Sequence, residues 1–152
     1  MKDIIHRIGI RGPAARVYDA LATIPGLAGW WTEETTGESK VGGVVKFVFH
    51  LENGELLGGF DMDVKELSPG DKVRWQVKDG PPEWIGTAIE FSLSRQDDFT
   101  IVLFSHRGWR EEVEFMAHCS TKWATFLVSL RDFVETGKGQ PAPNDLRLGN
   151  WH

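Results

Sequence analysis

The stretch that decides the fold of this chain spans residues 44–54 and reads VVKFVFHLENG. Apolar side chains recur at every second position from Val45 to Leu51, which is the period of a β-strand with one buried face. Asn53-Gly54 follows, the dipeptide most typical of a tight β-hairpin. The expected return strand carries alternating apolar residues at Phe60, Met62 and Val64. The sequence therefore predicts two antiparallel strands here.

Further alternating segments follow this hairpin. We expect strands over residues 73–77, 85–93 and 100–106, separated by turns at 68–71, 79–82 and 96–98 that are rich in Gly, Pro and Asp. The strand over 100–106 is apolar on both faces, as in a well-covered strand. The short turns between neighbouring segments predict an antiparallel meander.

The residues before the meander predict one strand and one helix. Apolar side chains alternate from Ile4 to Ile10, and Pro13 stands where its fixed φ suits a first helical turn. We expect a helix over residues 13–22, one more short helical turn up to Trp30, and a polar loop over 32–40.

The last long segment predicts an amphipathic helix from about Arg110 to Thr136, closed by Gly137 as its C-cap. Ser120 and Thr121 interrupt its apolar stripe, which predicts a kink or a break near the middle. We expect one domain over residues 1–137 and a mobile C-terminal tail over 138–152.

These elements bury their apolar faces only if the sheet curls around the last helix, which predicts an α+β grip. Seven tryptophans against one tyrosine supply wide rings that interlock less tightly than aliphatic side chains, so we expect a cavity between sheet and helix. Trp30 and Trp31 precede the first strand of the meander. We expect Trp30 to anchor the short helical turn and Trp31 to act as a lid.

The composition excludes several classes of function. The net charge of −5, with scattered Lys and Arg, disfavours a nucleic-acid partner. The apolar runs are far shorter than the ~20 residues that span a bilayer, so we expect no membrane span. The single cysteine, Cys119, forms no internal disulfide, and the first residues lack the pattern of a signal peptide. We therefore expect a cytoplasmic protein.

A set of ordered motifs gives the chain a resemblance to a known family. The set comprises Ala14 to Leu21, Trp30-Trp31, Gly42-Gly43, Glu66 to Pro69, Val73 to Trp75, Thr100 to His106 with Gly108, and Lys122-Trp123 with Leu127 and Leu130. Over residues 4–137 the chain resembles the activator-of-Hsp90 homologue-like proteins of the START-like (SRPBCC) superfamily. Lys122 departs from the glycine usual in that family. The resemblance implies a helix-grip fold with a pocket for hydrophobic ligands, including lipids.

The candidate ligand-binding residues are the aromatic side chains expected to face that pocket. They are Trp31, Phe47, Phe49, Trp75, Phe91, Trp123 and Phe126. Each of these residues taken singly also fits a plain core position. The hypothesis of a ligand pocket therefore rests on the set as a whole and not on any one residue.

Polar candidates are fewer. His50, His106, His118 and Cys119 show no metal-binding spacing, and adjacent residues such as His118 and Cys119 point to different helix faces, so we expect no metal, no cofactor and no catalytic residue. A second set of residues offers candidate polar groups at a pocket mouth; its members are Glu52, Glu90, His106 and Arg110.

The leading interpretation is a protein that binds a small hydrophobic molecule between the sheet and the last helix, and we favour binding over catalysis. One alternative is a co-chaperone-like module with a chaperone as its partner, which rests only on the family's name. The other is an enzyme of the cyclase or hydratase type that uses pocket acids and bases. That alternative requires a carboxylate or histidine buried inside the cavity.

Overall fold

The computed structural model describes residues 2–152. Its elements are β1 (Lys2–Ile10), α1 (Ala14–Ala22), α2 (Ile24–Trp30), β2 (Glu34–Gly37), β3 (Val44–His50), β4 (Leu56–Ser68), β5 (Lys72–Asp79), β6 (Ala88–Gln96), β7 (Phe99–Trp109) and α3 (Glu114–Thr136). The seven strands form one antiparallel sheet in the order β1-β7-β6-β5-β4-β3-β2. The α+β class and the helix-grip arrangement are therefore confirmed.

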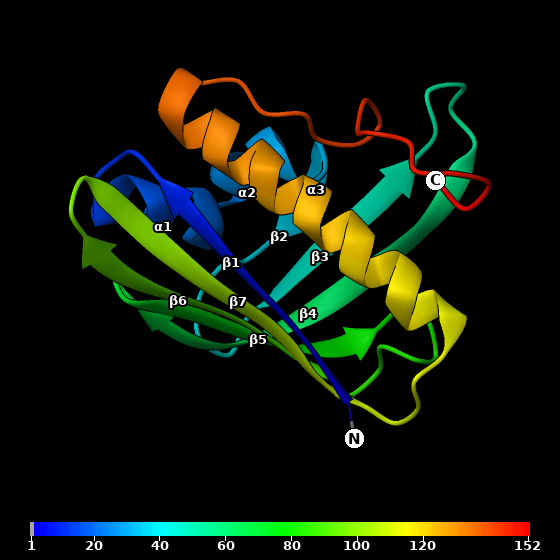
Figure 1. Cartoon of the computed structure of the whole chain (residues 1–152). Coiled ribbons are helices and arrows are strands. Elements are labelled where there is room, and N and C mark those ends of the chain that lie inside the picture. The colour runs from blue at the N-terminus through cyan, green and yellow to red at the C-terminus, as the bar shows by residue number, and fades with distance from the viewer. Residues whose placement is uncertain (1) are drawn as a thin grey trace.

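The sheet curves around α3, which lies across its inner face, while α1 and α2 cover one end (Figure 1). The meander strands bury alternate side chains toward this helix, as in β5, where Val73, Trp75 and Val77 are buried and Arg74 and Gln76 are exposed. That alternation is the one expected of a sheet with one wet face. None of the helices in residues 2–152 is long and apolar enough to cross a membrane.

Two expected boundaries at the start and middle of the chain are wrong. The segment expected to be a polar loop over 32–40 contains β2, because Thr35 pairs with Phe47 of β3. The Thr35 hydroxyl also donates to the Thr32 carbonyl at 2.7 Å. The strand expected from residue 85 begins at Ala88, because Ile85 lies in a turn and is 40% exposed.

The last helix begins later than expected, at Glu114. The sheet pairing continues to Trp109, which faces Lys2 of β1, and Arg110 donates to two carbonyls of the 80–86 turn instead of entering the helix. No kink occurs: α3 is continuous, and the Thr121 hydroxyl donates back to the Ala117 carbonyl at 3.3 Å. Gly137, with φ of 83°, ends the helix as predicted.

The segment expected to be a mobile tail packs against the body of the protein. We call residues 138–152 the strap. Ala142 exchanges backbone hydrogen bonds with Trp31 and Glu33 at 2.9 and 3.0 Å. Beyond it the strap runs back beside the β3–β4 hairpin (Figure 1). The composition of the tail does not reveal this return, because the partners of Ala142 are distant in sequence.

Candidate functional site

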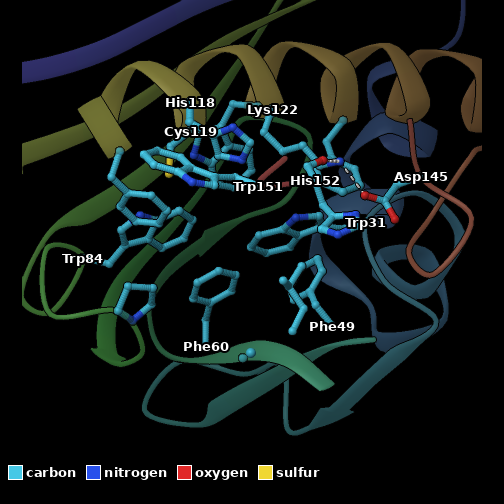
Figure 2. Close-up of a pocket in the computed structure, with 17 residues that line it drawn as sticks. Trp31, Phe49, Phe60, Trp84, His118, Cys119, Lys122, Asp145, Trp151 and His152 are labelled. Carbon is cyan, nitrogen blue, oxygen red and sulfur yellow. Dashed lines mark hydrogen bonds and ion pairs between the residues drawn. The ribbon is translucent and has the colours of Figure 1, made fainter. Parts of the chain in front are cut away.

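A cavity of about 210 Å³ lies between the sheet and the first half of α3 (Figure 2). Aromatic rings from α2, β3, β4, α3, the turn before β6 and the strap form most of its wall. Its lining residues are Trp31, Phe49, Leu57, Gly58, Gly59, Phe60, Pro81, Trp84, Phe115, His118, Cys119, Lys122, Trp123, Phe126, Asp145, Trp151 and His152. The wall is predominantly apolar, which suits an apolar occupant.

The rings of the wall stack on one another. Trp31 lies 4.9 Å from Trp123 between ring centroids and stacks on Trp75 at 6.0 Å. On the other side Phe60 stacks on Trp84 at 4.2 Å with an angle of 7° between the planes. Flat rings held by stacking are rigid and leave spaces at their edges, so the cavity has a fixed shape.

The structure divides the seven predicted site residues into two groups. Trp31, Phe49, Trp123 and Phe126 line the cavity. The other three lie in the core behind the wall, where Phe47 and Trp75 contact Trp31 and Phe91 contacts Trp75. This division says only which of the seven residues line the cavity. That each of them contacts a ligand remains a prediction.

Trp31 is not an exposed lid. Its side chain is 2% exposed and forms the inner wall. The exposed large apolar side chains at the edge of the cavity are Leu57 and Trp151, at 51% and 44%. Trp30 is fully buried and its indole N–H donates to the Ala20 carbonyl at 2.8 Å, so its expected role as the anchor of α2 is supported.

Several lining residues lie outside the predicted set. Trp84 follows a Gly-Pro-Pro turn and Trp151 lies in the strap, two regions that sequence patterns mark as loop. Phe60 and Phe115 sit at half-buried positions beside the cavity. Ring size is the available signal for Trp84 and Trp151, since a Trp in a loop needs an apolar surface to cover it.

Polar groups at the cavity are few. His118 and Cys119 both line it, although we expected adjacent helical residues to point apart. Burial raises the pKa of the Cys119 thiol to about 12, against a smaller lowering effect of the nearby Trp84 indole. Burial and the Lys122 charge lower the pKa of His118. Within residues 2–152 no three metal-binding side chains come together.

A hydrogen-bonded chain lies directly behind the wall. The Trp123 indole N–H donates to His106 Nδ1 at 3.2 Å, so the other ring nitrogen of His106 carries the proton and donates to the Thr87 hydroxyl at 2.7 Å. Thr87 donates in turn to the Trp84 carbonyl at 2.6 Å. Burial lowers the pKa of His106 to about 3, which keeps the ring neutral. The chain fixes Trp84 and Trp123, two rings of the wall.

The polar set proposed for the pocket mouth does not line this cavity. His106 lies behind the wall, and Arg110 is bound to the carbonyls of Pro82 and Ile85. Glu90 forms an ion pair with Lys72 at 4.0 Å on the sheet. Glu52 lines a neighbouring polar cavity instead.

Fold and cavity together define an α+β helix-grip domain with an aromatic chamber under its long helix. A family model described as "Activator of Hsp90 ATPase homolog 1-like protein" matches residues 11–135, and the chain belongs to this family. A comparison with curated proteins gave no match.

Solved structures share the fold. The Aha1 dimer from Colwellia psychrerythraea is 44% identical, with a TM-score of 0.80 over 91% of this chain and 100% of that one. Protein SSP2350 from Staphylococcus saprophyticus is 16% identical, with a TM-score of 0.72 over 93% and 98% of the two chains. CalU16 from Micromonospora echinospora is 19% identical, with a TM-score of 0.69 over 89% and 77%.

Proposed function

We propose that this protein binds a compact hydrophobic small molecule in the cavity under α3. The observation that carries the proposal is the chamber of about 210 Å³ with its wall of stacked rings. A buried apolar cavity of roughly 150 Å³ holds benzene, whereas drug-sized ligands occupy about 300–1,000 Å³. The volume therefore favours a compound of one or two rings over a long-chain lipid.

The chemistry of the wall also favours binding. Removal of the ligand's apolar surface from water drives association, and a preformed rigid wall reduces the entropic cost. The Trp84 indole N–H is buried and has only the Cys119 thiol, a weak acceptor, beside it, so a ligand oxygen that reached it would be a stronger partner. The Cys119 thiol stays protonated and Lys122 is paired with Asp145, which leaves these groups poorly suited to acid-base or nucleophilic work. We place this function in the cytoplasm, as the composition predicts.

Calorimetric titration with indole, naphthalene and a series of fatty acids tests the proposal. We expect the ring compounds to bind and the long fatty acids to bind less well. Cys119→Met extends an apolar side chain into the cavity and should lower ring-compound affinity by at least about tenfold. Ala117→Met, two residues away on an exposed position of the same helix, is the matched control. Binding that is equal in both variants, or absent from the native protein, would contradict the proposal.

A second candidate function is interaction with an Hsp90-type ATPase, and the family description favours it. The relative at 44% identity is named as Aha1 and as a dimer. An exposed apolar pair, Leu56 and Leu57, is 64% and 51% exposed at the start of β4 and offers a surface for such contacts. The test is the ATPase rate of an Hsp90 with and without this protein, with sedimentation to determine its oligomeric state. An unchanged ATPase rate counts against this candidate.

A further inference from the structure

The outer part of the strap is held to the rest of the protein by one polar side chain. In residues 2–152, every hydrogen bond or ion pair that joins residues 143–152 to the domain ends on Lys122 of α3. The remaining attachment is apolar, where the Trp151 ring lies 6.5 Å from Phe115 and 5.6 Å from His118. The strap beyond Ala142 can therefore leave without breaking any strand or helix.

All three N–H donors of the Lys122 ammonium are directed at groups of the strap. Its ammonium lies 2.5 Å from the Asp145 carboxylate and 2.6 Å from the backbone oxygen of His152, both drawn in Figure 2. It lies 2.6 Å from the Leu146 carbonyl oxygen as well. An ammonium has three N–H donors, so none is left over. The side chain is 15% exposed, and its Nζ lies 5.3 Å from the centre of the Phe126 ring. Lys122 is thus a mostly buried cation on an aromatic wall.

Asp145 and His152 also separate two chambers. A second cavity, of about 290 Å³, is lined by polar groups that include His50, Glu52 and Arg147. Asp145 and His152 line both this cavity and the aromatic one. Departure of the strap would therefore leave only Phe49 and Leu57 between the aromatic cavity and what remains of the polar one, with Lys122 beside them.

We propose that Lys122 is the anion-binding residue of the cavity and that Asp145 occupies the position of a ligand carboxylate, so that the preferred ligand is a compact aromatic acid that displaces the strap. This inference rests on the proposed function, since it names the chemical class of the ligand for the same cavity.

The charge balance supports an acid over a neutral ring. An ammonium covered by apolar groups without a partner is costly, so a neutral ligand that covers Lys122 in place of the strap leaves its charge unpaired. An acid replaces one carboxylate with another and conserves the ion pair, while its ring fills the apolar chamber. Lys122 and Asp145 are the only oppositely charged pair among the described lining residues, which places the acid group at one point of the wall.

Calorimetry with phenylacetate and its neutral near-isostere phenylacetone tests the proposal. Asp145→Asn removes the internal carboxylate and loosens the strap, and we expect it to raise the affinity for phenylacetate by about tenfold more than the affinity for phenylacetone. Lys122→Met should abolish the preference for the acid, whereas Lys122→Arg should retain it. Lys65→Met, at an exposed position of β4, is the matched control and should behave as the native protein.

The two proposals fail in different ways. If Asp145→Asn binds phenylacetone but does not bind phenylacetate more tightly than the native protein does, or gains equally in affinity for both probes, the anion site is overturned. The proposal of a hydrophobic binding cavity is then unaffected. Failure of both probes to bind Asp145→Asn overturns the anion site as well, and the titrations with indole and naphthalene then decide the proposed function separately. Because Asp145→Asn keeps Lys122 and the aromatic wall intact, this result does not depend on whether Lys122→Met folds.

Discussion

The two halves of α3 are packed in different ways. The second half packs closely against α2 around Leu130 and Phe133: Leu130 is fully buried, and Gly29 lies against the Phe133 ring, where a Cβ would collide. Buried Ser129 donates to the Trp30 carbonyl at 2.8 Å and accepts from the Gln140 N–H at 2.7 Å. The first half, from Phe115 to Phe126, faces the cavity.

The difference lies in the residues that meet the helix. Aliphatic side chains, glycine and a hydroxyl with two partners fill the closed half to the density of an ordinary core. In the open half wide rings meet other rings, and three buried indole N–H groups, those of Trp75, Trp84 and Trp109, have no conventional hydrogen-bond partner. Stability is thus concentrated in one half of a single helix and the candidate function in the other.

The largest effect should come from a deletion in the closed half. Leu130→Ala should lower the free energy of unfolding by about 2–5 kcal/mol, because it leaves a cavity in a filled core. Chemical denaturation measures this change. Affinity for ring compounds should remain that of the native protein, since Leu130 does not line the cavity. A Leu130→Ala variant with lost binding and native stability would reverse the assignment of the two halves.

The same substitution in each half gives a sharper test. Trp30→Phe removes an indole whose N–H donates to the Ala20 carbonyl at 2.8 Å, whereas Trp84→Phe removes one whose N–H has at most the weakly accepting Cys119 thiol beside it. Trp30→Phe should therefore be more destabilising, by about 1–3 kcal/mol, because it leaves a buried carbonyl unsatisfied. Parallel denaturation of both variants measures the difference. Equal losses would show that ring volume alone governs both halves.

Acid should weaken the fold through the chain behind the cavity wall. The pKa of His106 is about 3 in the folded protein against its ordinary 6.5, so the unfolded chain binds more protons between these values. The free energy of unfolding therefore falls as pH falls, by about 1.4 kcal/mol between roughly pH 7.5 and 5.5. His106→Gln should show a shallower decline. Identical pH dependence in the two proteins would exclude His106 as the cause.

Much of the fold could be predicted because its signals are local. Alternation over 44–51, the Asn53-Gly54 turn and the stripe of α3 each lie within a short window of sequence. The start of α3 was misplaced for a physical reason: Glu111 and Glu112 suit a first helical turn, but pairing of Trp109 with distant Lys2 extends β7 up to them. Tertiary pairing of this kind has no local signature.

The candidate site could be predicted only in part. Trp31, Phe49 and Trp123 were predicted from ring size and the expected grip, and they line the cavity. Alternation shows that a residue points inward, but it does not distinguish a filled core from a cavity wall, which is why Phe47 and Phe91 were placed in the same set. The strap was missed because its polar composition is that of a tail, while a single distant partner, Lys122, holds its outer part.

The smallest effect on stability, and the most direct probe of the open half, comes from Cys119. The thiol is 5% exposed, and burial raises its pKa to about 12, so thiolate is scarce at neutral pH. Iodoacetamide should therefore label the native protein at least about a hundredfold more slowly than the denatured one, and mass spectrometry measures both rates on the chain's one cysteine. Asp145→Asn loosens the strap beside this thiol and should speed up native labelling, while the exposed-site variant Lys65→Met should not. Fast labelling of the native protein would mean that the open half is not closed by the strap, and the contrast between the two halves of α3 would then be one of mobility rather than of packing.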